Sequence, residues 1–107
     1  MDQPRFVYTT FPDEETARRI AGILVQESLC ACVNLLPGMR AIYRYEGAVA
    51  EDGEVAAIVK TRTGLADAVE ARIRAEHPYN TPVFFHIDIA ATDAATRAWL
   101  MTETGAG

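Results

Sequence analysis

The stretch SLCACVNLLPG (residues 28–38) decides how this chain folds. Residues 31–36 form a short and mostly apolar run bounded by a Pro-Gly turn, which predicts a strand. Pro37 and Gly38 interrupt this run, and residues 39–45 continue in an extended pattern. A Pro-Gly interruption inside a long strand predicts a bulge, or a bend that carries the strand onto a second partner.

Cys30 and Cys32 stand one residue apart within this stretch. A structural metal site needs three or four convergent ligands, and Cys-x-Cys supplies two. A disulfide between them would close almost no loop and therefore stabilise little. We predict two reduced thiols that act as small hydrophobic side chains, most clearly Cys32 inside the strand and less clearly Cys30 at the helix–strand junction.

The rest of the chain supplies the other elements of one fold. Patterns typical of strands cover residues 5–10, 54–62 and 83–89, with a polar hairpin tip over 46–53. Helical patterns run from Asp13 to about Ser28, from a Thr63 N-cap to the residue before Pro78, and over 93–102. The order β-α-β-β-α-β predicts an α+β, ferredoxin-like sandwich with an antiparallel sheet, helices on one face and a short C-terminal helix.

Composition limits the classes of function. The chain has 107 residues, 50% of them hydrophobic and 23% charged, which predicts a single domain over 1–107. The net charge of −5 argues against a nucleic-acid surface, because phosphate binding needs clustered Lys and Arg. No run of 18 apolar residues exists, and no signal peptide is visible. We therefore expect a cytoplasmic protein with neither nucleic acid nor a membrane as partner.

Two histidines and the single lysine are the candidates for chemistry. His77 follows a predicted helix, with Glu76 and Tyr79 beside it in the turn AEHPYNTP, so it is either a capping residue or a metal ligand. His86 and Asp88 alternate on one face of the last strand and are expected to form a polar pair. Lys60 is expected to pair with a carboxylate or to bind an anionic ligand.

The segments CACVNLLPGM, YRYEG, Lys60-Thr61, HPYNTP and Trp99-Leu100 together resemble the divalent-cation tolerance protein family, CutA, over residues 6–100. The resemblance implies a ferredoxin-like fold, a tight homotrimer and an architecture similar to that of PII signalling proteins. It also implies copper ligands at a first-strand cysteine and at two consecutive histidines. These positions hold Thr9, Glu76 and His77 here, which leaves His77 and Glu76 as the candidate metal ligands.

The leading hypothesis is a homotrimer that responds to copper and other divalent cations by weak metal binding or by signalling, with no required cofactor. The alternative is a PII-like module that holds a small anion in clefts between subunits, lined by Lys60, Arg62 and Tyr79. An enzyme with His77 or His86 as general base ranks last, because no set of nucleophile, base and orienting residue can be assembled from the sequence.

Overall fold

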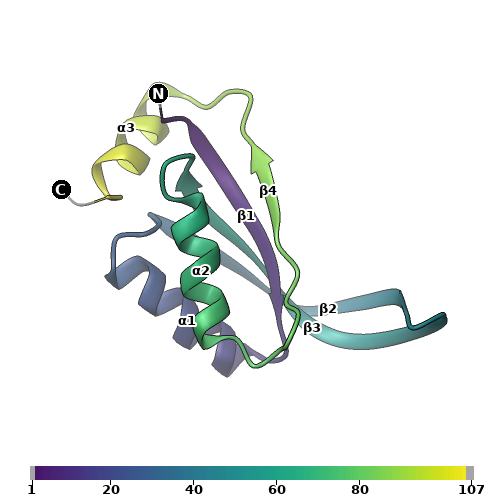
Figure 1. Cartoon of the computed structure of the whole chain (residues 1–107). Helices are drawn as coiled ribbons and strands as arrows, with labels where there is room; N and C mark the ends of the chain where they lie inside the picture. The colour runs from purple at the N-terminus through teal and green to yellow at the C-terminus, as the bar shows by residue number, and fades with distance from the viewer. Residues whose placement is uncertain (1, 106–107) are drawn as a thin grey trace.

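The computed structural model describes residues 2–105. Seven elements follow one another in the order β-α-β-β-α-β-α (Figure 1). Their bounds are β1 Pro4–Phe11, α1 Glu14–Gln26, β2 Cys32–Tyr45, β3 Ala48–Arg62, α2 Ala66–Glu76, β4 Phe85–Asp88 and α3 Ala94–Thr102. This is the predicted ferredoxin-like order with its additional C-terminal helix.

The four strands form one sheet in the order β2-β3-β1-β4. Neighbouring strands run antiparallel throughout. β3 therefore lies between β1 and β2, as its apolar middle section predicts, because a central strand is buried on both faces. The edges of the sheet are β2 and β4.

Helices α1 and α2 cover one face of the sheet (Figure 1). Aliphatic side chains spaced three or four residues apart on each helix meet the alternate residues of β1 and β3 that point toward them. The core is formed mainly by Val7, Phe11, Ala17, Ile20, Leu24, Cys30, Val55, Ala57, Val59, Val69 and Ile73. None of the helices within residues 2–105 has the length and apolar character needed to cross a membrane.

Cys30 belongs to this core, and Cys32 is only partly buried at the start of β2. Both cysteines are free, as predicted. The prediction that Cys32 is the better buried of the two is wrong. The reason is the position of each residue relative to β2: Cys32 pairs with Lys60 on the face of the sheet that α1 and α2 leave uncovered, whereas Cys30 precedes the strand and lies in the core under the helices.

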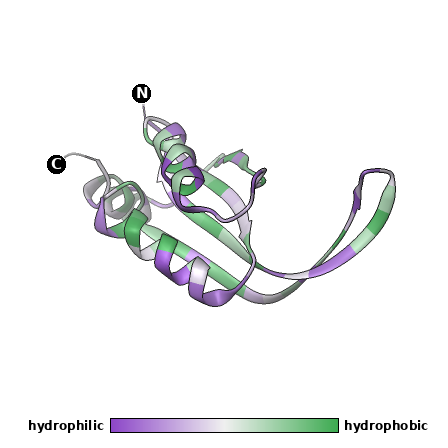
Figure 2. Cartoon of the chain, turned by 60° about the horizontal axis from the view of Figure 1, so that its bottom comes forward, coloured by the Kyte–Doolittle hydropathy of each residue, from purple (hydrophilic) through white to green (hydrophobic). Residues whose placement is uncertain are grey.

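A bulge interrupts the pairing of β2 with β3 between Leu36 and Met39. Gly38 lies there with a φ of 79°, a left-handed conformation that glycine adopts without steric cost. Beyond the bulge, β2 and β3 pair only with each other and form a curved two-stranded arm that projects from the sheet (Figure 1, Figure 2). The bulge confirms the bend predicted at Pro37-Gly38.

The arm turns at Glu46 and Gly47, whose φ values are 51° and 81°. Positive φ at both central residues is typical of the two-residue type I′ hairpin turn. The prediction of a polar tip over 46–53 is therefore wrong, because β3 already begins at Ala48. The polar residues of the arm belong to a strand that is largely exposed to solvent, and such a strand has the composition of a loop.

The starts of α2 and β4 also differ from the predicted ones. Leu65, with no side-chain hydrogen bond, precedes α2 in place of Thr63. The Thr63 hydroxyl instead donates to the Asp2 carboxylate and accepts from the backbone N–H of Gln3, so it fixes the N-terminal segment. β4 is shorter than predicted and begins at Phe85.

Candidate functional site

His77 ends helix α2, and its backbone N–H donates to the carbonyl of Ile73. Its φ and ψ of −77° and 135° are extended, as expected for a residue that precedes proline. The sequence AEHPY thus stops the helix at His77 and directs the imidazole inward. The His77 ring is buried and stacks on Phe11 of β1, with a centroid distance of 5.1 Å.

Both ring nitrogens of His77 have backbone partners. Nε2 lies 2.7 Å from the carbonyl oxygen of Thr10, and Nδ1 accepts from the backbone N–H of Tyr79 at 3.1 Å. Because a carbonyl only accepts, Nε2 carries the proton and Nδ1 uses its lone pair on Tyr79. A metal ion can bind this imidazole only by displacing one of the two hydrogen bonds.

Glu76, the second candidate ligand, contacts two arginines. Its carboxylate accepts from Arg72 Nη1 at 2.9 Å and from Arg19 Nη1 at 2.8 Å. The hydrogen bond from Arg72, followed by that from Arg19, lowers the pKa of Glu76. Through Arg19 the carboxylate links α2 to α1. A metal cation that binds Glu76 must compete with both guanidinium groups.

Near His77 the structure gathers a group of phenols and carboxylates that the sequence did not reveal. The Tyr79 hydroxyl donates to Glu54 at 2.8 Å, and Thr10 donates to the same oxygen at 3.2 Å. Across the arm, the Tyr43 hydroxyl donates to Asp52. All five residues line a groove between the arm and the segment that leads to β4.

These contacts shift the pKa of both phenols upward. For Tyr79 the main cause is burial, followed by the hydrogen bond to Glu54. For Tyr43 it is the hydrogen bond to Asp52. Both tyrosines are therefore neutral donors at physiological pH and unsuited to act as phenolate ligands. The signal in the sequence was the i, i+2 spacing of Asp52 and Glu54, which places both on one face once they are assigned to a strand.

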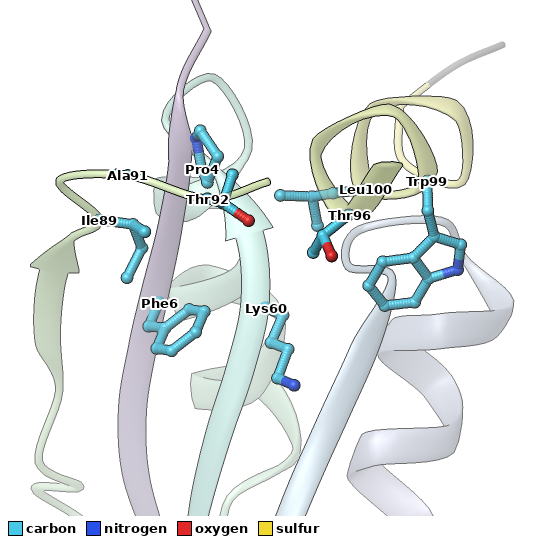
Figure 3. A pocket seen from close by; sticks show the side chains of 9 residues that line it. All are labelled: Pro4, Phe6, Lys60, Ile89, Ala91, Thr92, Thr96, Trp99 and Leu100. Atoms are coloured by element: carbon cyan, nitrogen blue, oxygen red, sulfur yellow. The ribbon is translucent and has the colours of Figure 1, made fainter. Parts of the chain in front are cut away.

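Lys60, Arg62 and Tyr79 do not line one cleft of the chain. Lys60 borders a cavity of about 200 Å³ beside α3 (Figure 3), whereas Tyr79 borders the groove next to the arm. Arg62 contacts the two ends of the chain, donating to the carbonyl of Thr104 at 3.0 Å and pairing with Asp2 at 3.5 Å. The expected pairing of Lys60 with a carboxylate is absent among residues 2–105.

The expected contact between His86 and Asp88 is replaced by two other pairs. His86 Nε2 lies 3.0 Å from Glu70 of α2, and Asp88 accepts from Arg5 of β1 at 2.7 Å. Thr9, at the position of the family cysteine, is buried, and its hydroxyl donates to the carbonyl of Val83 at 2.7 Å. In the part of the chain that the structure describes, no three His, Cys, Asp or Glu side chains converge as a metal site.

Comparison with known proteins assigns the family. The model of the CutA1 divalent ion tolerance protein family matches residues 5–103. The divalent-cation tolerance protein CutA of Thermus thermophilus is 43% identical over 99 residues, which cover 92% of this chain and 96% of that protein. A chloroplastic CutA 1 protein of Oryza sativa is 38% identical over 92% of this chain, which spans 55% of its length.

Solved structures agree with this assignment. The divalent cation tolerance protein Cut A1 of Thermus thermophilus superposes with a TM-score of 0.93 at 42% identity, covering 96% of this chain and 100% of that structure. Family and fold are thus supported by the match of the family model, by the sequence relatives and by the structure. The chain belongs to the CutA1 divalent ion tolerance protein family.

Proposed function

We propose that this protein works as a homotrimer in the response to divalent cations, by weak metal binding or by signalling and without catalysing a reaction. The observation that carries the proposal is the amount of apolar surface that a single chain leaves uncovered. Family membership supports the link to divalent cations.

The face of the sheet opposite α1 and α2 is the first uncovered surface. Phe85 and Ile87 of β4 lie on this face and are exposed, with Phe85 at 60%. Leu36 of β2 is also exposed. Large apolar side chains exposed on one face of a sheet favour protein–protein contact there.

The arm is the second uncovered surface, and each of its two sides carries exposed apolar or aromatic side chains among polar ones. Ile42 and Val49 lie on one face and are exposed, Ile42 at 71%, while Tyr43 and Tyr45 lie on the other. An isolated two-stranded hairpin is marginally stable in water and needs a further layer or strand. Neighbouring subunits that cover the sheet and both sides of the arm would supply it, and would protect the unpaired edges of β2 and β4.

For the metal, His77 remains our proposed main ligand and Glu76 the second, with copper or another divalent cation bound weakly. The geometry supports weak metal binding. A metal ion must displace one hydrogen bond of the His77 ring and the hydrogen bonds that Glu76 accepts from two arginines. A location in the cytoplasm also remains a prediction, and the name of the rice relative places that protein in the chloroplast.

Native mass spectrometry of protein purified from metal-supplemented cells tests both parts at once, because it reports the subunit count and any retained ion. Calorimetric titration with Cu²⁺ then compares wild type with His77→Ala. His86→Ala, which removes the other histidine, is the matched control. We expect micromolar or weaker binding that His77→Ala abolishes and His86→Ala preserves. Equal binding by all three proteins would exclude His77 as the ligand.

A further inference from the structure

We propose that Lys60 of one subunit enters the groove next to the arm of the neighbouring subunit and forms an ion pair with Glu54 there. The inference rests on the homotrimer of the proposed function and names one contact that holds it together. β3 carries both residues on the face of the sheet that α1 and α2 leave uncovered, because side chains alternate along a strand and Val55, Ala57 and Val59 point into the core. Neighbouring subunits would cover this face.

Lys60 is a cation without a counter-charge in its own chain. It is half-buried beside Phe6, its partner on β1 (Figure 3). None of the ion pairs formed within residues 2–105 includes it. When a neighbouring subunit covers this face, an unpaired ammonium group would lose its water at a high cost in free energy. A stable trimer therefore needs an anion opposite Lys60.

Glu54 lies at the arm end of the same strand face and lacks a cation. Its carboxylate accepts hydrogen bonds from the Tyr79 hydroxyl at 2.8 Å and from the Thr10 hydroxyl at 3.2 Å, and both donors are neutral. Asp52, two residues away, accepts from the Tyr43 hydroxyl. Neither carboxylate forms an ion pair within the described part of the chain. The groove thus presents two negative charges to whatever covers it.

The spacing of the two charges favours contact between subunits over contact within one. Lys60 and Glu54 lie six positions apart on β3, which is about 20 Å along the strand and too far for one lysine side chain to span. A ring of three subunits uses heterologous contacts, in which one surface meets a different surface of the next subunit. Opposite charges at the two ends of one strand face suit such a ring, because its closure leaves neither group unpaired.

The other cations that form no ion pair within residues 2–105 lie elsewhere in the fold. Arg18 is exposed on α1, on the opposite side of the sheet. Arg44 lies on the face of the arm opposite to that of Asp52. Arg97 of α3 donates to the N-terminal segment. Lys60 is therefore the cation of this set that shares the uncovered sheet face with the groove.

Lys60 is the only lysine of the chain, which allows a direct test. A water-soluble carbodiimide activates a carboxylate, and a lysine amine in contact with it forms an amide bond as the carbodiimide leaves as a urea. We expect wild type to give covalent oligomers on a denaturing gel, with Lys60 and Glu54 joined in one crosslinked peptide. Lys60→Arg keeps the charge and forms no stable amide, so it should remain trimeric and lose this crosslink.

Charge reversal measures what the contact contributes to assembly. Lys60→Glu and Glu54→Lys each bring like charges together, so each should raise the protein concentration at which half of the trimer dissociates by at least about tenfold. The double variant restores opposite charges and should dissociate at a lower concentration than either single variant. Arg18→Glu on α1 is the matched control and should dissociate like wild type. Light scattering over a dilution series gives the comparison.

The outcomes separate this contact from the proposed function. A wild-type trimer in which Lys60 couples to a carboxylate outside the groove, or to none, overturns the contact and leaves the proposed function standing. A double variant that is weaker than both single variants overturns it as well. A monomeric wild type would refute the proposed function together with this contact.

Discussion

The Nε2 atom of His77 lies 2.7 Å from the carbonyl oxygen of Thr10, which joins the end of α2 to the end of β1 across 67 residues of sequence. With Nδ1 occupied by the Tyr79 N–H and the ring stacked on Phe11, the imidazole acts as a structural connector.

His77→Ala is expected to lower the free energy of unfolding by about 1–3 kcal/mol, because it leaves a buried carbonyl and a backbone N–H without partners. Urea denaturation of the purified variant measures the loss. His86→Ala removes a contact with Glu70 at the protein surface and should change stability by less than about 1 kcal/mol. Equal stability of the two variants would contradict the connecting role of His77.

Gly105 packs against the guanidinium of Arg62 with a φ of 92°, and a Cβ there would lie 1.9 Å from Arg62 Nη2. Gly105→Ala should therefore destabilise the protein by about 1–2 kcal/mol, through backbone strain and displacement of Arg62 from Thr104. Gly22→Ala is the matched control, because a Cβ there meets nothing within 4 Å and α1 gains about 0.5–1 kcal/mol. Thermal denaturation of both variants should show shifts of opposite sign, and shifts of the same sign would refute the prediction.

Glu76 has a folded-state pKa below its ordinary value of 4.5 because Arg72 and Arg19 stabilise the carboxylate. Its contribution to stability is therefore present above the unfolded-state pKa and is lost as the pH falls through the folded-state pKa. Wild type should lose stability between about pH 5 and pH 3, and Glu76→Gln should lose less over the same interval. Denaturant midpoints at the two pH values give the comparison, and identical losses would show that Glu76 is not linked to folding.

Cys30 is buried, and this burial raises the pKa of its thiol to about 12. Because the thiolate is the reactive form, Cys30 should resist alkylation in the native protein and react readily in urea. Cys30→Ser should cost about 1–3 kcal/mol, more than Cys32→Ser, because it buries a hydroxyl in the apolar core. Peptide mapping after alkylation and denaturation of both variants check this, and rapid native labelling of Cys30 would rule it out.

The sequence was sufficient for the order of the elements, because each carries its own local signal. Pro78 marks the end of α2, and the Pro37-Gly38 pair marks the bulge. The arm was predicted less well, since the segment around Asp52 is a strand exposed to solvent and its composition resembles that of a loop.

The candidate site was only partly predictable. The position of His77 at a helix end follows from its neighbours, but its contact with Thr10 depends on tertiary packing. Likewise, the PII-like alternative places Lys60 and Tyr79 in clefts between subunits, an arrangement that the sequence of one chain does not determine. The extended strand β3 carries Lys60 to the α3 end of the sheet, whereas Tyr79 lies near the arm, so only a neighbouring subunit could bring such residues together.

The most direct test of the account is the mass in solution of wild type and two matched variants at micromolar concentration, measured by light scattering. Ile42→Asp places a charge on the arm, and Val25→Asp places one on α1, where the exposed fraction of the side chain is 46%. The account predicts a mass of three times 11.7 kDa for wild type and Val25→Asp, and a smaller mass for Ile42→Asp. A wild-type mass of 11.7 kDa, or an intact trimer with Ile42→Asp, would contradict it.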